Sequence, residues 1–134
     1  MPTPRVLFVC LHGSAKSLIA LEHFRRLAQQ RGVEVQADWA GLEPDAEIPP
    51  KVVQGLLGEG IDVRERRPRQ VTRADVERAS RVVTFGCDLG TLESSGLVRE
   101  RWDDVPAVSA GYKPARDVIV GRLPGLLDEV GRTA

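Results

Sequence analysis

The sequence predicts one domain over residues 1–134 with an α/β fold, a three-layer α/β/α sandwich around a four-stranded, mostly parallel, doubly wound sheet. The first observation behind this prediction is that short apolar, β-branched stretches alternate with amphipathic helical stretches. The second is that 134 residues suffice for one hydrophobic core but not for two. The third is that the two most apolar strands each run into a polar loop with a cysteine, where open α/β sheets place their sites.

The first half of the chain contains two predicted strands and two predicted helices. Residues 5–9 form an apolar run between prolines and a Gly/Ser-containing loop, which is typical of a buried parallel strand. Apolar residues at helical spacing follow over residues 17–28, and Gly32 is placed to end that helix. Alternating apolar residues over 33–37 indicate the second strand. A pair of prolines then precedes a short helix over about residues 51–57.

The second half begins with a helix and two further strands. Thr72, with Asp75 three residues later, is placed to cap a short helix that ends at Ala79. Residues 81–85 are the second strongly apolar strand, and residues 98–102 suit a fourth strand at the edge of the sheet.

The last predicted helix begins at Tyr112 or Pro114 and ends at Val130. We expect Gly121 and Pro124 to bend or interrupt this helix, because proline removes a backbone hydrogen bond and crowds the preceding turn. The residues expected on its apolar face are Ala115, Val118, Ile119, Leu123, Leu126, Leu127 and Val130.

Charge and composition exclude several classes of function. The chain has 19 basic and 19 acidic residues and a pI near 6.7, so nucleic-acid and membrane-surface binding are not expected. The basic run over residues 64–69 is interpreted as a solvated loop. Because no signal-peptide-like or long apolar stretch occurs, we expect a cytoplasmic protein with small soluble partners. Two cysteines and two histidines are too few for a disulfide framework or a zinc site, so no metal or cofactor is expected.

The most informative stretch is the loop between the first strand and the first helix. A strand that runs into a short loop and then a helix directs backbone N–H groups and the positive end of the helix dipole at one point, where an oxyanion can bind. Cys10 at the start of this loop adds a nucleophile, and the N–H groups, the dipole and Lys16 would favour its thiolate form. From spacing alone, a buried structural cysteine is the competing interpretation.

Nucleotide binding fits this loop poorly. Lys16-Ser17 at a helix start also occurs in the nucleotide P-loop, but that motif needs glycine where this chain has Cys10 and Ala15. No G-x-G-x-x-G follows a strand either, so dinucleotide binding is disfavoured as well. The remaining pattern, Cys10-x5-Lys16-Ser17, wraps the loop around one tetrahedral anion with the cation on its far side.

The segment 6–17, VLFVCLHGSAKS, resembles the active-site loop of the low-molecular-weight protein tyrosine phosphatase and arsenate reductase superfamily, whose signature is C-x5-R-[ST] after a hydrophobic strand. The resemblance covers nearly the whole chain and implies the fold of that family. His12 and Gly86-Cys87 are more similar to the arsenate-reductase branch than to the phosphotyrosine branch. Further segments resemble the family in the same order and at similar distances: 40–41, 60–62, 67–72, 82–87, and the tail from 102–104 to 116–117.

The resemblance implies a role for each position of the loop. Cys10 would attack phosphorus or arsenic, Lys16 would supply positive charge, and Ser17 would hydrogen-bond the thiolate or stabilise the leaving sulfur. The oxyanion would be bound by the loop residues Leu11, His12, Gly13, Ser14, Ala15 and Lys16.

Two departures from the family pattern bear on activity. The signature arginine is here Lys16, and an ammonium cannot grip two oxygens at once as a guanidinium does. The loss of such a clamp is on the order of the 2.7–4 kcal/mol attributed to one oxyanion donor, which predicts slow or absent turnover. The family's general acid is an aspartate directly before a proline, whereas this chain has Asp103-Asp104-Val105-Pro106. Asp104 is the expected general acid, and Asp103 is the structural alternative.

Cys87 matches the position of a second thiol in arsenate reductases of this fold. There it attacks the arsenylated first cysteine, so a disulfide between Cys10 and Cys87, reduced by thioredoxin or a small thiol, is one possibility. A small thiol in place of Cys87, or a buried and inert Cys87, are the others. His12 is expected to be a hydrogen-bond partner within the loop rather than a base, and His23 is expected to be solvated.

Three functions from different classes follow. The first is a phosphatase in which Cys10 attacks a phosphomonoester and water releases phosphate from the cysteinyl-phosphate. The second is a thiol-dependent arsenate reductase that uses Cys10 with Cys87 or an external thiol. The third is a catalytically degenerate module that binds an oxyanion or a phosphorylated partner without turnover, which the lysine in place of arginine favours.

Overall fold

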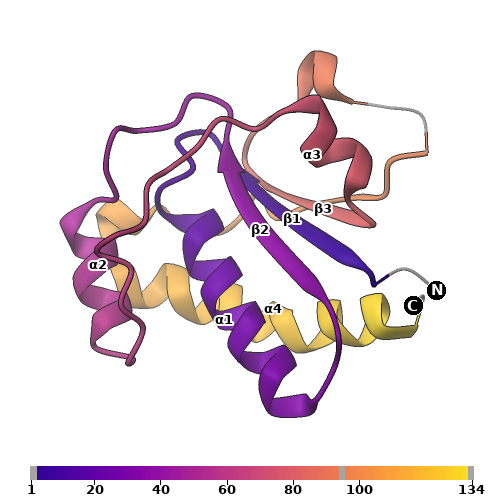
Figure 1. The fold of residues 1–134 in the computed structure, drawn as a ribbon. Coiled ribbons are helices and arrows are strands. Elements are labelled where there is room, and N and C mark those ends of the chain that lie inside the picture. Colours follow the sequence, from indigo (N-terminus) through magenta and orange to yellow (C-terminus); the bar gives the residue numbers. More distant parts are fainter. Residues whose placement is uncertain (1–2, 94–95, 133–134) are drawn as a thin grey trace.

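The computed structural model describes residues 3–93 and 96–132, and within them four parallel strands form one sheet (Figure 1). The strands are β1 (Arg5–Cys10), β2 (Gln36–Gly41), β3 (Arg81–Phe85) and β4 (Arg99–Arg101), in the order β2-β1-β3-β4. The chain therefore leaves the central strand β1 for one neighbour and returns on its other side to form β3. In such sheets the ligand lies at the carboxyl ends of the strands, beside this reversal.

Helices cover both faces of the sheet, as predicted. The helices α1 (Lys16–Arg31), α2 (Pro50–Leu57) and α4 (Tyr112–Arg132) lie on one face, and α3 (Arg73–Arg78) lies on the other (Figure 1). The α/β sandwich is thereby confirmed.

β1 is buried on both faces because its side chains alternate between two cores. Phe8 packs edge-on against Phe24 of α1, with ring centroids 5.6 Å apart, in the larger core under α1, α2 and α4. Leu7 and Val9 point to the smaller core, where they join Val76 of α3. Burial on both faces explains why the strand is apolar from Val6 to Cys10.

Local signals in the sequence fix two of the helices as predicted. Gly32 ends α1 in the left-handed conformation with φ of 65°, and its N–H bonds back to carbonyls of the last turn. Thr72 and Asp75 form a reciprocal capping box at the start of α3.

The predicted second strand was placed too early. β2 begins at Gln36 because its partner β1 begins at Arg5, and these two residues are opposite each other in the parallel register. Val33 and Val35 precede the strand but still pack against the larger core, which explains their apolar pattern.

The predicted interruption of the last helix was wrong. α4 is continuous from Tyr112 to Arg132 with Gly121 and Pro124 inside it. The buried side chains on either side of the proline, Leu123 and Leu126, hold the helix against the core, and this packing offsets the lost hydrogen bond.

The prediction of a solvated His23 was also wrong. The side chain of His23 is 6% exposed, and its Nε2 lies 3.2 Å from Oε2 of Glu59. Glu59 also accepts hydrogen bonds from the Tyr112 hydroxyl at 2.7 Å and from Nε of Arg116 at 2.7 Å. Burial lowers the pKa of His23 below its usual value, against the opposing effect of the Glu59 charge. This network joins α1 to α4 through the segment after α2.

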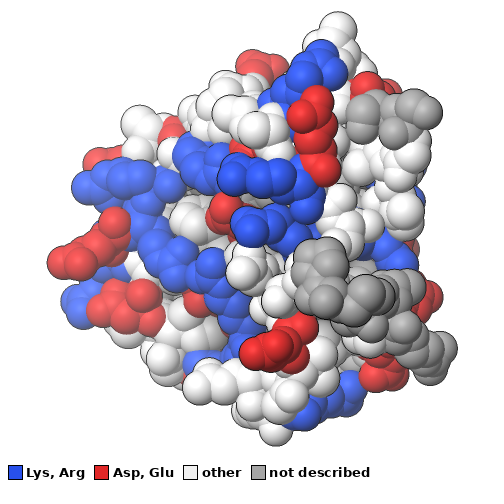
Figure 2. Space-filling view, turned by 45° about the vertical axis from the view of Figure 1, so that its right-hand side comes forward, with Lys and Arg blue, Asp and Glu red and all other residues white. Residues whose placement is uncertain are grey.

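Basic and acidic side chains are interleaved on the surface. Figure 2 shows Lys and Arg gathered over part of one face, with Asp and Glu among them. Within the basic run 64–69, Arg66 pairs with Glu22 at 2.8 Å, and Arg69 pairs with both Asp38 and Asp75 at 2.8 Å. These arginines are therefore tied to the fold rather than fully solvated. In the described part of the chain, no helix combines the length and the apolar character needed to cross a membrane.

The loop after β1 packs directly on the end of β2. Gly13, with φ of +59°, approaches Gly41 so closely that a Cβ on Gly41 would lie 2.6 Å from the backbone nitrogen of Gly13. A Cβ at either glycine would meet backbone atoms of the other, and backbone atoms cannot rotate away as a side chain can. Glycine is therefore required at both positions by contact, and Gly13 also by its left-handed backbone.

We predict that Gly41→Ala lowers the free energy of unfolding by about 1–3 kcal/mol, the usual cost of overpacking. The matched control is Gly125→Ala in α4, where the added Cβ meets nothing within 4 Å and favours the helix by roughly 0.5–1 kcal/mol. Urea denaturation of both variants measures the two changes. A Gly41→Ala variant as stable as the unsubstituted protein would contradict the close contact between loop and strand.

Candidate active site

The loop between β1 and α1 turns its carbonyl groups outward. The carbonyls of Cys10, Leu11 and His12 accept hydrogen bonds from the backbone N–H groups of residues 42, 43 and 45, at 3.3, 2.7 and 3.0 Å. The carbonyl of Gly13 accepts one from the Trp39 indole at 2.8 Å. Four consecutive carbonyls are thus held by β2 and the segment that follows it. Since the carbonyl and N–H groups of a peptide point in opposite directions, the N–H groups of the loop face its interior.

These inward N–H groups have no acceptor within the described residues. The first backbone N–H after Cys10 with an acceptor in the described parts of the chain is that of Ile19, which bonds to the Ala15 carbonyl at 3.0 Å. Ala15, the N-cap of α1, has no oxygen in its side chain, and the first turn carries no acidic residue. N–H groups at a helix start that have no partner can bind an anion, so the loop is suited to one at the positive end of the helix dipole.

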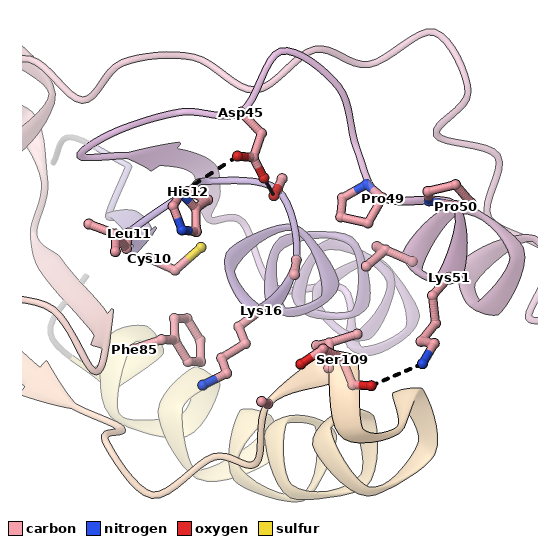
Figure 3. A pocket seen from close by; sticks show the side chains of 15 residues that line it. Cys10, Leu11, His12, Lys16, Asp45, Pro49, Pro50, Lys51, Phe85 and Ser109 are labelled. Atoms are coloured by element: carbon pink, nitrogen blue, oxygen red, sulfur yellow. Dashed lines mark hydrogen bonds and ion pairs between the residues drawn. The ribbon is translucent and has the colours of Figure 1, made fainter.

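Cys10 lies at the base of this loop and faces a cavity of about 490 Å³ (Figure 3). The residue is 7% exposed, and its Sγ lies 3.0 Å from Oγ of Ser17. Ser17 is fully buried and has no other hydrogen-bond partner in the described ranges, so its hydroxyl proton is available to a thiolate. The buried thiol predicted as one alternative is therefore present, yet it opens on a cavity.

The wall of the cavity opposite the loop is mainly apolar. It is formed by the start of α2, the end of β3 and the segment before α4. The lining residues from these elements include Pro49, Pro50, Val52, Phe85, Ala107 and Val108. Such a wall accepts the apolar part of a ligand whose anionic group lies in the loop.

Lys16 lines the cavity from the first position of α1. Its Nζ donates to the Val105 carbonyl at 3.0 Å, and in Figure 3 the ammonium lies beside Phe85, across the cavity from Asp45. Lys51 is the other lysine on the cavity lining, and its Nζ donates to the Ser109 carbonyl at 3.1 Å. The segment between β4 and α4 therefore anchors both cations by backbone carbonyls.

Neither predicted general acid lines the cavity. Oδ2 of Asp104 lies 2.6 Å from Nη2 of Arg122, and its side chain is 72% exposed. The hydrogen bond from Arg122 lowers the pKa of Asp104, so this carboxyl is ionised at neutral pH. Asp103 accepts from the Gly86 N–H at 3.1 Å and from Nε of Arg101 at 3.0 Å. Both carboxylates are thus engaged in hydrogen bonds and ion pairs outside the cavity.

Cys87 lies on the other face of β1 from the cavity. It is 8% exposed within the smaller core, and its thiol donates a long hydrogen bond of 3.7 Å to the Val9 carbonyl, adjacent to Cys10. Burial raises the pKa of the Cys87 thiol, and the neighbouring Cys10 raises it further. Cys87 is therefore a protonated thiol whose hydrogen-bond partner, Val9, directly precedes Cys10.

The structure also brings to the cavity a carboxylate that the sequence reasoning missed. Oδ2 of Asp45 accepts from Oγ of Ser14 at 2.7 Å, and its Oδ1 lies 3.5 Å from Nδ1 of His12 (Figure 3). Asp45 follows β2 in a proline-containing segment, and only the packing of that segment on the loop places it here. Over the described ranges, no group of three or more His, Cys, Asp or Glu side chains is arranged to hold a metal ion.

Among known proteins, this chain is similar to arsenate reductases. A curated relative from Halobacterium salinarum, named "Putative arsenate reductase", is 28% identical over 132 residues, covering 95% of this chain and 93% of that protein. The solved thioredoxin-dependent arsenate reductase of Corynebacterium glutamicum is 25% identical with a TM-score of 0.81, and the match covers all of this chain but only 64% of that one.

A phosphatase structure has the same fold. The low molecular weight phosphotyrosine phosphatase of Vibrio cholerae O395 superposes with a TM-score of 0.82 at 18% identity, covering 94% of this chain and 95% of that one. The family model described as low molecular weight phosphotyrosine protein phosphatase matches residues 5–92, which include the loop, β1 to β3 and Cys87. The chain therefore belongs to the low molecular weight phosphotyrosine protein phosphatase family, whose fold it has.

Proposed function

We propose that this protein hydrolyses phosphomonoesters with Cys10 as the nucleophile. The observation that supports this most directly is the run of backbone N–H groups after Cys10 that have no acceptor among the described residues, at the start of α1, where Ala15 provides no side-chain cap. Such groups favour the thiolate and bind the phosphoryl oxygens, and they stabilise the charge that these oxygens carry in the transition state. One loop thereby binds the substrate and activates the nucleophile.

The proposed reaction has two steps. The Cys10 thiolate attacks phosphorus, so that an S–P bond forms while the ester P–O bond breaks and the leaving alcohol takes up a proton. Water then attacks phosphorus, the S–P bond breaks, and phosphate is released with the thiolate restored. Ser17, 3.0 Å from the sulfur, stabilises the thiolate before the first step and after the second.

Lys16 is proposed to supply positive charge near the phosphoryl group. Its ammonium has more than one donor hydrogen, so it can keep its bond to the Val105 carbonyl and still attract the anion. A single point charge holds the oxygens less firmly than a bidentate guanidinium. The proposal therefore includes slower turnover than an arginine at this position would give.

The apolar wall supports an ester with an apolar body. Pro49, Pro50 and Phe85 flank the part of the cavity in front of the loop (Figure 3). Burying apolar surface there contributes binding free energy that is independent of the phosphate. Aryl phosphates are the substrate class that this shape favours.

Arsenate reduction is the second candidate, and the position of Cys87 is the observation that favours it. In that reaction the Cys10 thiolate would displace hydroxide from arsenate and form an S–As bond. A second thiolate would then attack the Cys10 sulfur, so that the S–As bond breaks with its electron pair going to arsenic, and a disulfide and arsenite form. Cys87 is close to Cys10, but it is protonated and held in the smaller core, so it would have to move and ionise. A cytoplasmic reductant, thioredoxin or a small thiol, would then reduce the disulfide. Hydrolysis of a phosphate ester requires neither the movement nor the ionisation of Cys87.

Oxyanion binding without turnover is the remaining possibility from the sequence. It shares the loop and the cavity with the phosphatase and differs only in the absence of the chemical steps. Substitution of the two cysteines distinguishes all three functions.

We predict that Cys10→Ser abolishes hydrolysis of p-nitrophenyl phosphate, lowering kcat by several orders of magnitude, because the hydroxyl is a far weaker nucleophile than the thiolate. Cys87→Ser is the matched control, since it makes the same atomic change at the second thiol and should retain most of the hydrolysis. Steady-state release of p-nitrophenol measures both variants.

Three results would contradict this proposal. Hydrolysis by Cys10→Ser equal to that of the unsubstituted protein would exclude the nucleophile. Absence of hydrolysis, together with thioredoxin-coupled arsenate reduction that needs Cys87, would favour the reductase. Absence of both reactions with retained phosphate binding would favour the binding module.

We predict that Lys16→Arg raises kcat/KM for p-nitrophenyl phosphate roughly tenfold or more, because one further charge-assisted hydrogen bond in the transition state contributes about 1.5–3 kcal/mol. Lys113→Arg is the control for the substitution itself, since Lys113 is 83% exposed on α4 and pairs with Asp117. A decrease in kcat/KM for Lys16→Arg would show instead that the site depends on lysine and on its bond to the Val105 carbonyl.

A further inference from the structure

The acid–base chemistry of the proposed hydrolysis needs a group that faces the cavity. The leaving oxygen must receive a proton in the first step, and water must lose one in the second. Asp104 would have to break its 2.6 Å ion pair with Arg122 to reach the cavity, and Asp103 is bonded to Gly86 and Arg101. The titratable side chains among the described residues that line the cavity are Cys10, the two lysines Lys16 and Lys51, His12 and Asp45.

The hydrogen bonds of His12 fix which ring nitrogen is available. Nδ1 lies 3.2 Å from the Glu43 carbonyl, and because a carbonyl can only accept, Nδ1 carries a hydrogen. Nε2 has no hydrogen-bond partner among residues 3–93 and 96–132. Nε2 is therefore the ring nitrogen whose lone pair or hydrogen is free for a ligand.

The carboxylate of Asp45 stands beside the same ring. Its Oδ1 lies 3.5 Å from Nδ1, so it can balance the positive charge of a protonated imidazole. Its other oxygen accepts from Ser14, which is 2% exposed and belongs to the same loop. The pair is thus held by a buried side chain, although the His12 side chain itself is 58% exposed.

The position of the His12 imidazole is suited to proton transfer to a ligand in the cavity. In Figure 3 the imidazole stands at the loop side of the cavity, between the labelled Asp45 and Cys10. A phosphoryl group bound in the loop would lie against the Cys10 sulfur, and its ester oxygen would extend into the cavity that His12 also lines. An imidazole on this lining is exposed enough to exchange protons with water between the two steps.

We propose that His12, oriented by the Glu43 carbonyl and Asp45, is the general acid and base of this site through its Nε2. This rests on the phosphatase function proposed above. In the first step the protonated Nε2 gives its hydrogen to the leaving oxygen as the P–O bond breaks, which leaves the imidazole neutral. In the second step Nε2 takes a proton from the attacking water as the S–P bond breaks, which restores the imidazolium and the Cys10 thiolate.

The dependence of activity on the leaving group tests this role. A general acid matters most for a poor leaving group and little for one that departs without protonation. We expect His12→Asn to lower kcat/KM, which reports the first step, roughly 100-fold or more with phenyl phosphate and to change it little with 2,4-dinitrophenyl phosphate. Asp104→Asn, which replaces the general acid expected from the sequence by an amide outside the cavity, should affect both substrates alike.

A second variant, Asp45→Asn, tests whether the effect of His12→Asn is chemical rather than structural. Asp45→Asn keeps an acceptor for Ser14 but removes the charge beside His12, and we expect a smaller loss with the same dependence on the leaving group. Inhibition by inorganic phosphate and the thermal midpoint, measured for every variant, report whether the loop is intact.

The outcomes separate this inference from the phosphatase function. Equal losses of kcat/KM for His12→Asn with both substrates would overturn the role in protonating the leaving oxygen and leave the function standing. A leaving-group-dependent loss for Asp104→Asn but not for His12→Asn would assign the role to Asp104. Absence of Cys10-dependent turnover with either substrate in the unsubstituted protein would overturn both proposals.

Discussion

The arrangement of peptide groups after Cys10 is the constraint on which the site depends. Four consecutive carbonyls can face outward because β2 and the segment behind it supply N–H donors and the Trp39 indole. The contact of Gly13 with Gly41 allows the two backbones to come close enough for these bonds. The N–H groups are left inside the loop as a consequence, and an unpaired buried N–H group costs free energy until an anion or water binds it.

This constraint connects the fold to the proposed chemistry. The parallel order β2-β1-β3 places the end of β1 between two strands, so the loop is supported by β2 on one side while the end of β3 contributes Phe85 to the cavity. The side chains of the loop have different proposed roles. Cys10 is the proposed nucleophile and Ser17 is its hydrogen-bond partner, whereas Lys16 joins the loop to the segment before α4. His12 and Asp45 join the loop to the segment after β2, which gives the proposed acid–base pair a rigid support.

Much of the fold was predictable because its signals are local. The apolar run before Cys10, the glycine after α1 and the Thr72–Asp75 box each act within a few residues, and their elements form as expected. The errors concern long-range packing. The start of β2 is set by its register with β1, and the burial of His23 is set by Glu59, 36 residues away. The use of Asp45 depends likewise on a segment that folds back over the loop, and no spacing in the sequence reports that.

The claim that the loop's N–H groups bind a tetrahedral oxyanion can be measured directly by amide NMR. Titration of inorganic phosphate into the Cys10→Ser protein removes turnover from the experiment while leaving the backbone donors in place. The account predicts saturable downfield shifts of the amide protons of residues 11 to 17, because hydrogen bonds to an anion deshield them. Saturable shifts confined to other basic segments, such as residues 64 to 69, or no saturable shift in the loop, would contradict it.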